Sequence, residues 1–429
     1  MASPQDSPRP AEGSSTADGD GTRGRLILTD ATVIDGRGGK PLERASILIE
    51  GRRIRGVESS AESFGTQQPG DRVVNLSGRY VIPGLFNLHE HIYRKNMLKV
   101  RPGWHYDDVS RALEGENDNY LVVWAARHAL DYLRAGVTTI RCIGERSDLV
   151  VSLRRAIDQG LVVGPRLQVA VKLIVMTGGH GHYIGREADG PAEIRKATRE
   201  QLRAGADFIK IIATGGLLGM PKESPGNPQL TVEEIRAATE VAHRAGKLTT
   251  AHADATQGIQ NAVQGGIDCI EHGAFLDDRT IEMMLEHDVS LVPTLSGLRG
   301  YADWQRRAGN AQLADFIDRE VNAKHVESFQ KARAAGVRIG VGSDTPAITI
   351  DEIEDLNRAG MPPDECLLAA TSTAAKIAGL GGNLGTIEAD KFADLVVLAE
   401  DPNRDVQALR AIEMVIKDGT SVPLTGPVL

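Results

Sequence analysis

Residues 80–91, YVIPGLFNLHEH, decide the fold. An apolar run passes through a Pro83-Gly84 turn and ends in two histidines, His89 and His91. Side chains at positions i and i+2 of a β-strand point to the same face, so we expect both imidazoles to project from the end of one strand. Two imidazoles held side by side form half of a transition-metal site. The alternative is a chance His-x-His in a loop.

Outward from this stretch, short apolar runs alternate with amphipathic stretches. The runs that predict strands are 81–88, 137–143, 167–173, 208–212, 248–253, 268–272, 290–294 and 338–343. The stretches that predict helices are 119–136, 149–160, 192–205, 231–246, 256–266, 278–288 and 325–336. Thr231 followed by Glu234 is typical of a capping box at a helix start. Eight β-then-α units predict an α/β fold of the (β/α)8 TIM-barrel type, with an open doubly wound sheet as the alternative.

The two ends of the chain have a different, purely β pattern of short alternating runs separated by Gly and Asp. We therefore expect residues 25–80 and 385–429 to form one small β-sandwich domain, and residues 81–384 to form the barrel. Residues 1–24 are rich in Ser, Pro, Gly and Asp, which predicts a disordered tail. They lack the apolar segment of a secretory signal.

Composition limits the classes of partner. The net charge of −9 disfavours nucleic acid, because phosphate binding requires clustered Lys and Arg. No apolar run approaches the ~20 residues of a membrane span. Three cysteines, Cys142, Cys269 and Cys366, are widely spaced. This odd, sparse set argues against a disulfide framework and fits a reducing compartment, so we expect a cytoplasmic protein.

Further metal-binding residue types occur at the ends of other predicted strands: Lys210, His252, His272 and Asp344. Lys210 lies in the apolar run FIKII, where desolvation favours a neutral amine that can react with carbon dioxide to give a carbamate. Each residue alone has a simpler reading. The lysine can snorkel, a strand-end histidine can be a hydrogen-bonded core residue, and an Asp can cap a helix. The series of all of them is what favours a metal site.

The chain resembles the amidohydrolase superfamily with a binuclear, carboxylated-lysine site. Residues 81–91 are similar to the family's V-x-P-G-x-x-x-x-H-x-H, and residues 371–402, TSTAAKIAGLGGNLGTIEADKFADLVVLAEDP, are similar to its C-terminal motif. Within the superfamily the chain is similar to the imidazolonepropionase-like group that contains metal-dependent prolidases. Imidazolonepropionase itself lacks the bridging lysine, so Lys210 points away from it. Deaminase relatives carry a glutamate shortly after the histidine of the fifth strand. Here His252 is followed by Ala253-Asp254-Ala255, which argues against deamination.

The resemblance implies a cofactor set and a mechanism. One divalent metal ion would be held by His89, His91, carboxylated Lys210 and Asp344, and a second by Lys210, His252 and His272. Zinc is the default ion. A bridging hydroxide would attack the scissile carbonyl, and Asp344 would carry its proton to the leaving amine. A homo-oligomer is also implied.

A Gly-rich loop, TGGHGHYIGREADG at 177–190, supplies candidate residues for substrate contact. His180 and His182 are expected to bind the substrate carbonyl or carboxylate and to assist catalysis. Tyr93 and Arg186, with Arg94 and Arg101, are weaker candidates for carboxylate recognition. The alternative is a surface turn with incidental histidines and solvated arginines.

These observations predict a hydrolase of carbon–nitrogen bonds that takes a small-molecule amide. The predicted substrate is a dipeptide of the Xaa-Pro type or an N-acyl amino acid, including ochratoxin-like amides. A urea or carbamate hydrolase of the phenylurea or thiocarbamate type is the alternative. A catalytically inactive structural relative is the alternative from another class.

Overall fold

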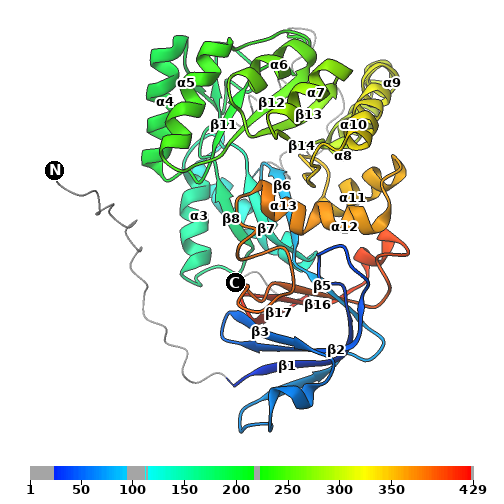
Figure 1. Ribbon diagram of the computed structural model, residues 1–429. Helices are drawn as coiled ribbons and strands as arrows, with labels where there is room; N and C mark the ends of the chain where they lie inside the picture. Colours follow the sequence, from blue (N-terminus) through cyan, green and yellow to red (C-terminus); the bar gives the residue numbers. More distant parts are fainter. Residues whose placement is uncertain (1–23, 94–111, 113–114, 217–222, 427–429) are drawn as a thin grey trace, which may run out of the picture.

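The computed structural model describes residues 24–93, 112, 115–216 and 223–426. It contains a β-sheet built from both ends of the chain and, beside it, a larger α/β body (Figure 1). Among the described residues, no helix combines the length and the apolar character needed to cross a bilayer.

The terminal sheet has eight strands in the order β17-β16-β15-β5-β1-β2-β3, with β4 paired to β1. Its strands are β1 Leu26–Val33, β2 Leu42–Glu50, β3 Arg53–Glu58, β4 Arg72–Asn75, β5 Tyr80–Pro83, β15 Leu395–Leu398, β16 Ile412–Lys417 and β17 Thr420–Val422. Strand β5 joins the two ends, because it pairs with β1 on one side and with β15 on the other. The expected union of the termini is therefore seen. The strands form one continuous hydrogen-bonded path, and side chains of β1, β2, β5, β15 and β16 share one buried apolar cluster.

One edge of β1 pairs with two different strands. Residues 26–29 of β1 pair with β4 and residues 32–33 pair with β5. Between them the register of β1 against β2 shifts, and Asp30 has a φ of 59°. An irregularity of this kind bends a strand and increases its twist, so β1 can pair with two differently placed strands along the same edge.

The run 81–88 is two strands, where one was expected. Strand β5 ends at Pro83 and strand β6 is Leu85–Glu90. At the junction the Gly84 N–H donates to Asp394 O in the terminal sheet, at 2.8 Å, whereas the Leu85 N–H donates to Gly136 O, at 2.9 Å. A Cβ at Gly84 would lie 2.2 Å from Thr138 Oγ1. Glycine thus permits the close approach at which the chain changes from one sheet to the next.

The strands of the α/β body form two parallel sheets. One is β6-β7-β8, with β7 Val137–Cys142 and β8 Arg166–Val169. The other is β10-β9-β11-β12-β13-β14, with β9 Ile174–Val175, β10 Arg186–Glu187, β11 Ile209–Ile212, β12 Thr249–Ala255, β13 Cys269–Phe275 and β14 Ser290–Val292. The expected strand 338–343 is reduced to a bridge between Ile339 and Leu291, with a further bond from Leu88 N–H to Val341 O at 2.8 Å.

Helices follow the strands of this body, as predicted. They are α2 Asp118–Arg134, α3 Leu149–Asp158, α4 Gly190–Ala204, α5 Val232–Arg244, α6 Thr256–Gln264, α7 Asp278–Glu286, α8 Leu295–Arg307, α9 Ala311–Phe316, the π-helix Ile317–Asn322, α10 Ala323–Ala335, α11 Thr349–Arg358, α12 Pro363–Ala370 and α13 Ser372–Ile377. Short 3-10 helices are Ala61–Phe64 and Val406–Arg410. The capping box of Thr231 and Glu234 is present at the start of α5. The sequence missed α8, α9 and α11–α13.

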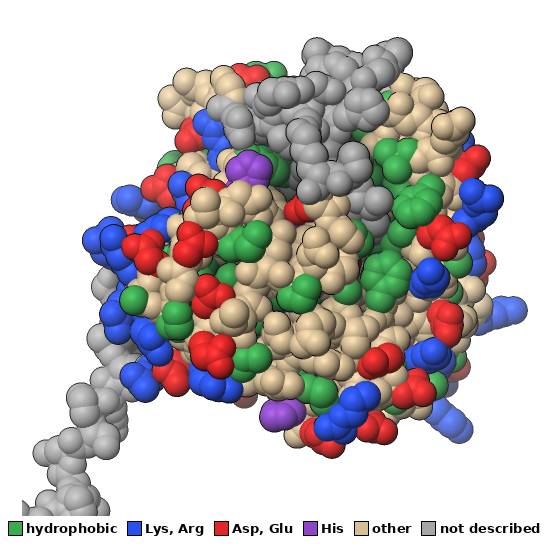
Figure 2. Space-filling view, turned by 90° about the horizontal axis from the view of Figure 1, so that it is seen from above, with side chains coloured by type: hydrophobic (Ala, Val, Ile, Leu, Met, Phe, Trp, Pro, Cys, Tyr) green, Lys and Arg blue, Asp and Glu red, His purple; other side chains and the backbone are tan. Residues whose placement is uncertain are grey.

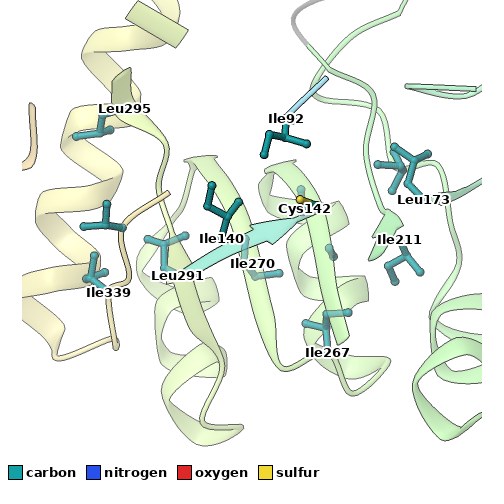
Figure 3. Close-up of a cluster of buried hydrophobic side chains, with 14 of the residues drawn as sticks. Ile92, Ile140, Cys142, Leu173, Ile211, Ile267, Ile270, Leu291, Leu295 and Ile339 are labelled. Atoms are coloured by element: carbon teal, nitrogen blue, oxygen red, sulfur yellow. The ribbon is translucent and has the colours of Figure 1, made fainter. Parts of the chain in front are cut away.

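Alternate residues of the strands separate the hydrophobic core from the interior that carries the polar groups. Ile211, Ile270 and Leu291 belong to the main cluster of buried apolar side chains between strands and helices (Figure 3). Lys210, next to Ile211, lies in the other direction and lines a pocket. Because side chains alternate along a strand, one side of these strands packs in the hydrophobic core and the other side faces the pocket.

Candidate metal centre

All six side chains expected to hold metal line one pocket of about 60 Å³, which is room for a few water-sized groups. They are His89, His91, Lys210, His252, His272 and Asp344. They come from β6 and the residue after it, from β11, β12 and β13, and from the segment after Val341. The sequence placed them at strand ends. Lys210 instead lies near the start of β11, and both His252 and His272 lie within their strands. Seen from above, charged side chains of both signs lie along the margins of the molecule (Figure 2).

His89 and His91 are oriented by hydrogen bonds on the same ring atom. His89 Nδ1 lies 2.7 Å from Glu271 Oε2, and His91 Nδ1 lies 2.7 Å from Gly144 O. An acceptor at Nδ1 requires the proton there and places the lone pair on Nε2. The ring centroids of the two histidines are 5.9 Å apart. The two rings therefore lie together, as the His-x-His spacing predicts, and each has an Nε2 lone pair that could bind a metal ion.

His272 reaches the pocket through an unusual backbone conformation. Glu271 and His272 are consecutive on β13, yet both approach His89, Glu271 through a hydrogen bond and His272 with ring centroids 4.8 Å apart. Regular alternation would send one of them to the opposite face. His272 has a φ of 74°, in the left-handed region that costs energy for a residue other than glycine. Its Nδ1 lies 2.7 Å from Thr294 Oγ1, whose own hydroxyl donates to Pro293 O at 2.6 Å.

His252 uses the opposite ring atom. Its Nε2 lies 3.2 Å from Gly215 O and 3.4 Å from Asp254 Oδ2, so Nδ1 is the atom that could bind a metal ion. Its ring is 4.6 Å from that of His272. Burial lowers the pKa of both imidazoles well below the ordinary value, and the neighbouring histidines add to this shift. Neutral imidazole is the form that binds a metal ion.

Lys210 has the most unusual environment in the pocket. Its side chain is 2% exposed. Among the described residues, none accepts a hydrogen bond from Nζ. Burial lowers the pKa of the amine to about 8, although the carboxylates of Glu271 and Asp344 favour the charged form. A buried ammonium without an acceptor is costly, so Lys210 fits a site that a ligand completes.

Asp344 faces His89 across the pocket, with Oδ2 3.7 Å from His89 Nε2. The Thr345 N–H donates to its Oδ1 at 2.6 Å, and the Asp344 N–H donates to His89 O at 2.9 Å. Its φ of 53° is again left-handed. Ligand atoms of His89, His272 and Asp344 all lie within 4.8 Å of one another. This spacing, the neutral imidazoles and the partnerless Lys210 Nζ together fit a divalent metal ion.

Sequence reasoning missed Glu271, which is fully buried on β13. Besides His89, it accepts a hydrogen bond from Arg141 Nη2 at 2.6 Å and one from the Thr250 hydroxyl. Such a partner fixes the tautomer and direction of a ligating ring. The available signal was the Glu-His dipeptide itself, since a charged residue inside a buried strand requires partners.

Among the predicted substrate contacts, His180 lines the pocket. His182 is exposed, and its Nδ1 lies 3.1 Å from Gly179 O. Arg186 pairs with Glu200 at 2.8 Å. Tyr93 is buried in the hydrophobic core. None of these last three is among the described residues that line the pocket. Arg94 and Arg101 lie outside the described residues.

Pocket residues that the sequence did not single out surround these groups. Asp254 is buried, and burial raises the pKa of its carboxyl to about 8. Tyr183, Leu298, Tyr301 and Thr345 also line the pocket. They lie in loops and on helix α8, where the sequence has no period that would distinguish a pocket residue from a surface residue.

Comparisons with known proteins agree with this geometry. Residues 80–422 match the model of the amidohydrolase family. An ochratoxinase from Aspergillus niger is 27% identical over 421 residues, covering 89% of this chain and 83% of that protein. A prolidase complexed with N-methylphosphonate-L-proline has a TM-score of 0.83 at 29% identity, covering 93% of this chain and 99% of that one. A Xaa-Pro dipeptidase with methionine bound in its active site has a TM-score of 0.81 at 29% identity, with the same coverage.

Proposed function

The chain belongs to the amidohydrolase family, and from this premise we propose that it hydrolyses the amide bond of a Xaa-Pro-type dipeptide or of an N-acyl amino acid, including ochratoxin-like amides. Hydrolysis of carbon–nitrogen bonds follows from the family and its relatives. The observation that carries the narrower proposal is the pocket in which five further metal-binding side chains surround the buried Lys210. The similarity to a prolidase and to an ochratoxinase supports the choice of substrates.

We assign His89, His91, Lys210 and Asp344 to one divalent ion and Lys210, His252 and His272 to a second, with zinc as the expected metal. When bound, the ions supply an activated water at neutral pH and polarise a carbonyl. The lowered pKa of Lys210 supports its carboxylation. In that step the neutral amine nitrogen bonds to the carbon of carbon dioxide and releases one proton, and the product is a carbamate with two oxygen ligands.

The protein's own groups organise the reaction around the bound amide. Glu271 and Gly144 O hold the rings of His89 and His91 in place. The Thr345 N–H fixes the carboxylate of Asp344. Asp344 takes the proton of the attacking water and returns it to the leaving amine, the role expected of a carboxylate placed beside the reacting atoms.

We also propose that the two parallel sheets close into a (β/α)8 barrel spanning residues 81–384, with a small β domain from 25–80 and 385–429. Backbone hydrogen bonds between the sheets support closure. Asp207 N–H donates to Val169 O at 2.8 Å, and Leu88 N–H donates to Val341 O at 2.8 Å. A homo-oligomer in the cytoplasm and the disordered tail 1–24 remain predictions.

The test combines metal analysis with a substrate panel. Purified protein is reconstituted with zinc and bicarbonate and assayed with Xaa-Pro dipeptides, N-acyl-phenylalanines and phenylureas. We expect about two metal ions per chain and turnover of a dipeptide or N-acyl amino acid. Turnover of the phenylureas alone would replace the proposal by urea hydrolysis. Less than one metal ion per chain without restoration would identify an inactive relative.

A further inference from the structure

The ring of His180 is held between His252 of strand β12 and Gly216 of the loop after strand β11. On one side its ring stacks on that of His252, with centroids 4.5 Å apart and planes inclined by 21°. On the other side lies Gly216, where a Cβ would come within 2.3 Å of the His180 ring. A glycine at 216 is therefore required for the ring to lie flat against His252.

A carboxylate fixes the direction of this ring. His180 Nδ1 lies 2.5 Å from Glu223 Oε1, and the side chains are 11% and 20% exposed, respectively. A carboxylate accepts a hydrogen bond and does not donate one, so the Nδ1 atom carries the proton. The remaining ring nitrogen, Nε2, is the one left to meet a ligand in the pocket that His180 lines.

Gln229 secures both partners at once. Its side-chain oxygen accepts the His180 N–H at 2.9 Å, and its side-chain nitrogen lies 3.4 Å from Glu223 Oε2. The Gln229 N–H donates to Ala213 O at 2.8 Å, just after strand β11. The loop of His180 and the loop of Glu223 are thus joined through three side chains and are anchored to the strand that carries Lys210.

We propose that Glu223 is the positioning residue of His180: it holds the imidazole between His252 and Gly216 with Nε2 directed at the scissile amide. Glu223 acts only through His180 and touches neither substrate nor metal. The inference rests on the proposed amide hydrolysis and deepens it, because it names the group that orients the substrate-facing histidine. An orienting partner of this kind does for His180 what Glu271 does for His89.

A double-mutant cycle tests the coupling, with kcat and KM measured on the best amide of the panel. We expect Glu223→Ala to lower kcat about tenfold to a hundredfold, with KM changed by less than about threefold. Adding Glu223→Ala to His180→Ala should cause no further loss, because the effects of residues that act as a unit are not additive. Glu223→Gln keeps an acceptor oxygen for Nδ1–H and should restore most of kcat.

Glu187→Ala is the matched control. Glu187 accepts the Gly178 N–H at 2.7 Å on the same loop but does not contact His180, so this variant should retain full kcat, and all variants should retain their metal. Wild-type kcat in Glu223→Ala, a further loss in the double variant, or an equal loss in Glu187→Ala would each overturn the inference.

A crystal structure separates this inference from the proposed function. If the wild type hydrolyses none of the amides, the proposed function fails. The position of the His180 ring then decides by itself whether Glu223 orients it. We expect the His180 ring bonded to Glu223 in the wild type and rotated or spread over several orientations in Glu223→Ala. An unchanged ring in that variant would show that Glu223 does not position it.

Discussion

Two largely buried cationic side chains of this protein, Lys210 and Arg166, differ in how their charge is compensated. Lys210 is in the metal pocket, and no described residue accepts a hydrogen bond from its Nζ. Arg166 lies between the terminal sheet and the α/β body, where its Nη2 is 2.7 Å from Asp418 Oδ1 and 3.7 Å from Asp394 Oδ2. Its guanidinium also lies 4.7 Å from the ring centre of Phe392.

The difference lies in how far the neighbouring side chains compensate the charge of each cation. Burial raises the pKa of Asp394, but at Asp418 the nearby Arg166 and Lys417 outweigh burial and hold the pKa at about 2. The charges there are compensated within the chain. At Lys210 burial prevails and the pKa falls to about 8. Substitutions at the two sites should therefore affect different properties: activity at Lys210 and stability at Arg166.

The largest effect is expected from Lys210→Ala and from Asp344→Asn. Each should lower kcat on the order of a thousandfold, since several kcal/mol of transition-state stabilisation depend on the ions these residues are proposed to hold. Steady-state kinetics in metal-defined buffer measure it. Lys196→Ala, at an exposed lysine, is the control and should keep full activity. Wild-type turnover in either pocket variant would contradict the mechanism.

Arg166→Met should instead lower the free energy of unfolding. We expect a loss of about 3 kcal/mol, because the buried carboxylate of Asp394 and the partly exposed carboxylate of Asp418 lose their cation. Since Arg166 is itself partly exposed, the effect lies at the low end for a buried pair. Urea denaturation measures this loss, and kcat per folded molecule should stay unchanged. Arg155→Met, at an exposed position of α3, is the control. A fall in kcat with no loss of stability would reverse the contrast between the two sites.

Lys210→Met should make the metal-free protein more stable at pH 7, by about 2 kcal/mol. Below pH 8 the lysine is charged in both states, so the native protein bears the full cost of burial. As the pH rises from 8 to 10.5 the native amine is already neutral while the unfolded one is still charged, and the stability of the wild type rises. The advantage of the variant should shrink over that range. A pH-independent difference in chemical denaturation would refute this account.

The sequence predicted the residues of the site better than their geometry. His89, His91, Lys210, His252, His272 and Asp344 could be found because metal-binding residue types in buried strands are rare and recurred along the chain. The left-handed backbone at His272 could not be found, since it depends on packing between β13 and the chain around it. The interpretation of Arg186 was not supported by the pocket geometry, because its partner Glu200 lies in the last turns of helix α4, whose orientation no local pattern reveals.

Parts of the fold were predictable because their sequence patterns are strong. The seven helices with strong periodicity appeared at nearly the expected bounds, and the capping box of Thr231 and Glu234 formed as predicted. The run 81–88 was misjudged because an uninterrupted apolar pattern does not reveal a change of sheet at Gly84. The segment 338–343 has the apolar pattern expected of a strand, but it forms only one bridge pair, between Ile339 and Leu291.

Strand β5 has a consequence for how the protein is made. It lies between β1 and β15, so its second neighbour is synthesised some 300 residues later, after the whole α/β body. Until β15–β17 leave the ribosome, one edge of β5 has no strand to pair with, and pairing across such a separation is slow. Translation that stops before Leu395 would therefore leave an open sheet edge directly attached to the strand that bears His89. Truncated chains of this protein should aggregate rather than accumulate as partly active enzyme.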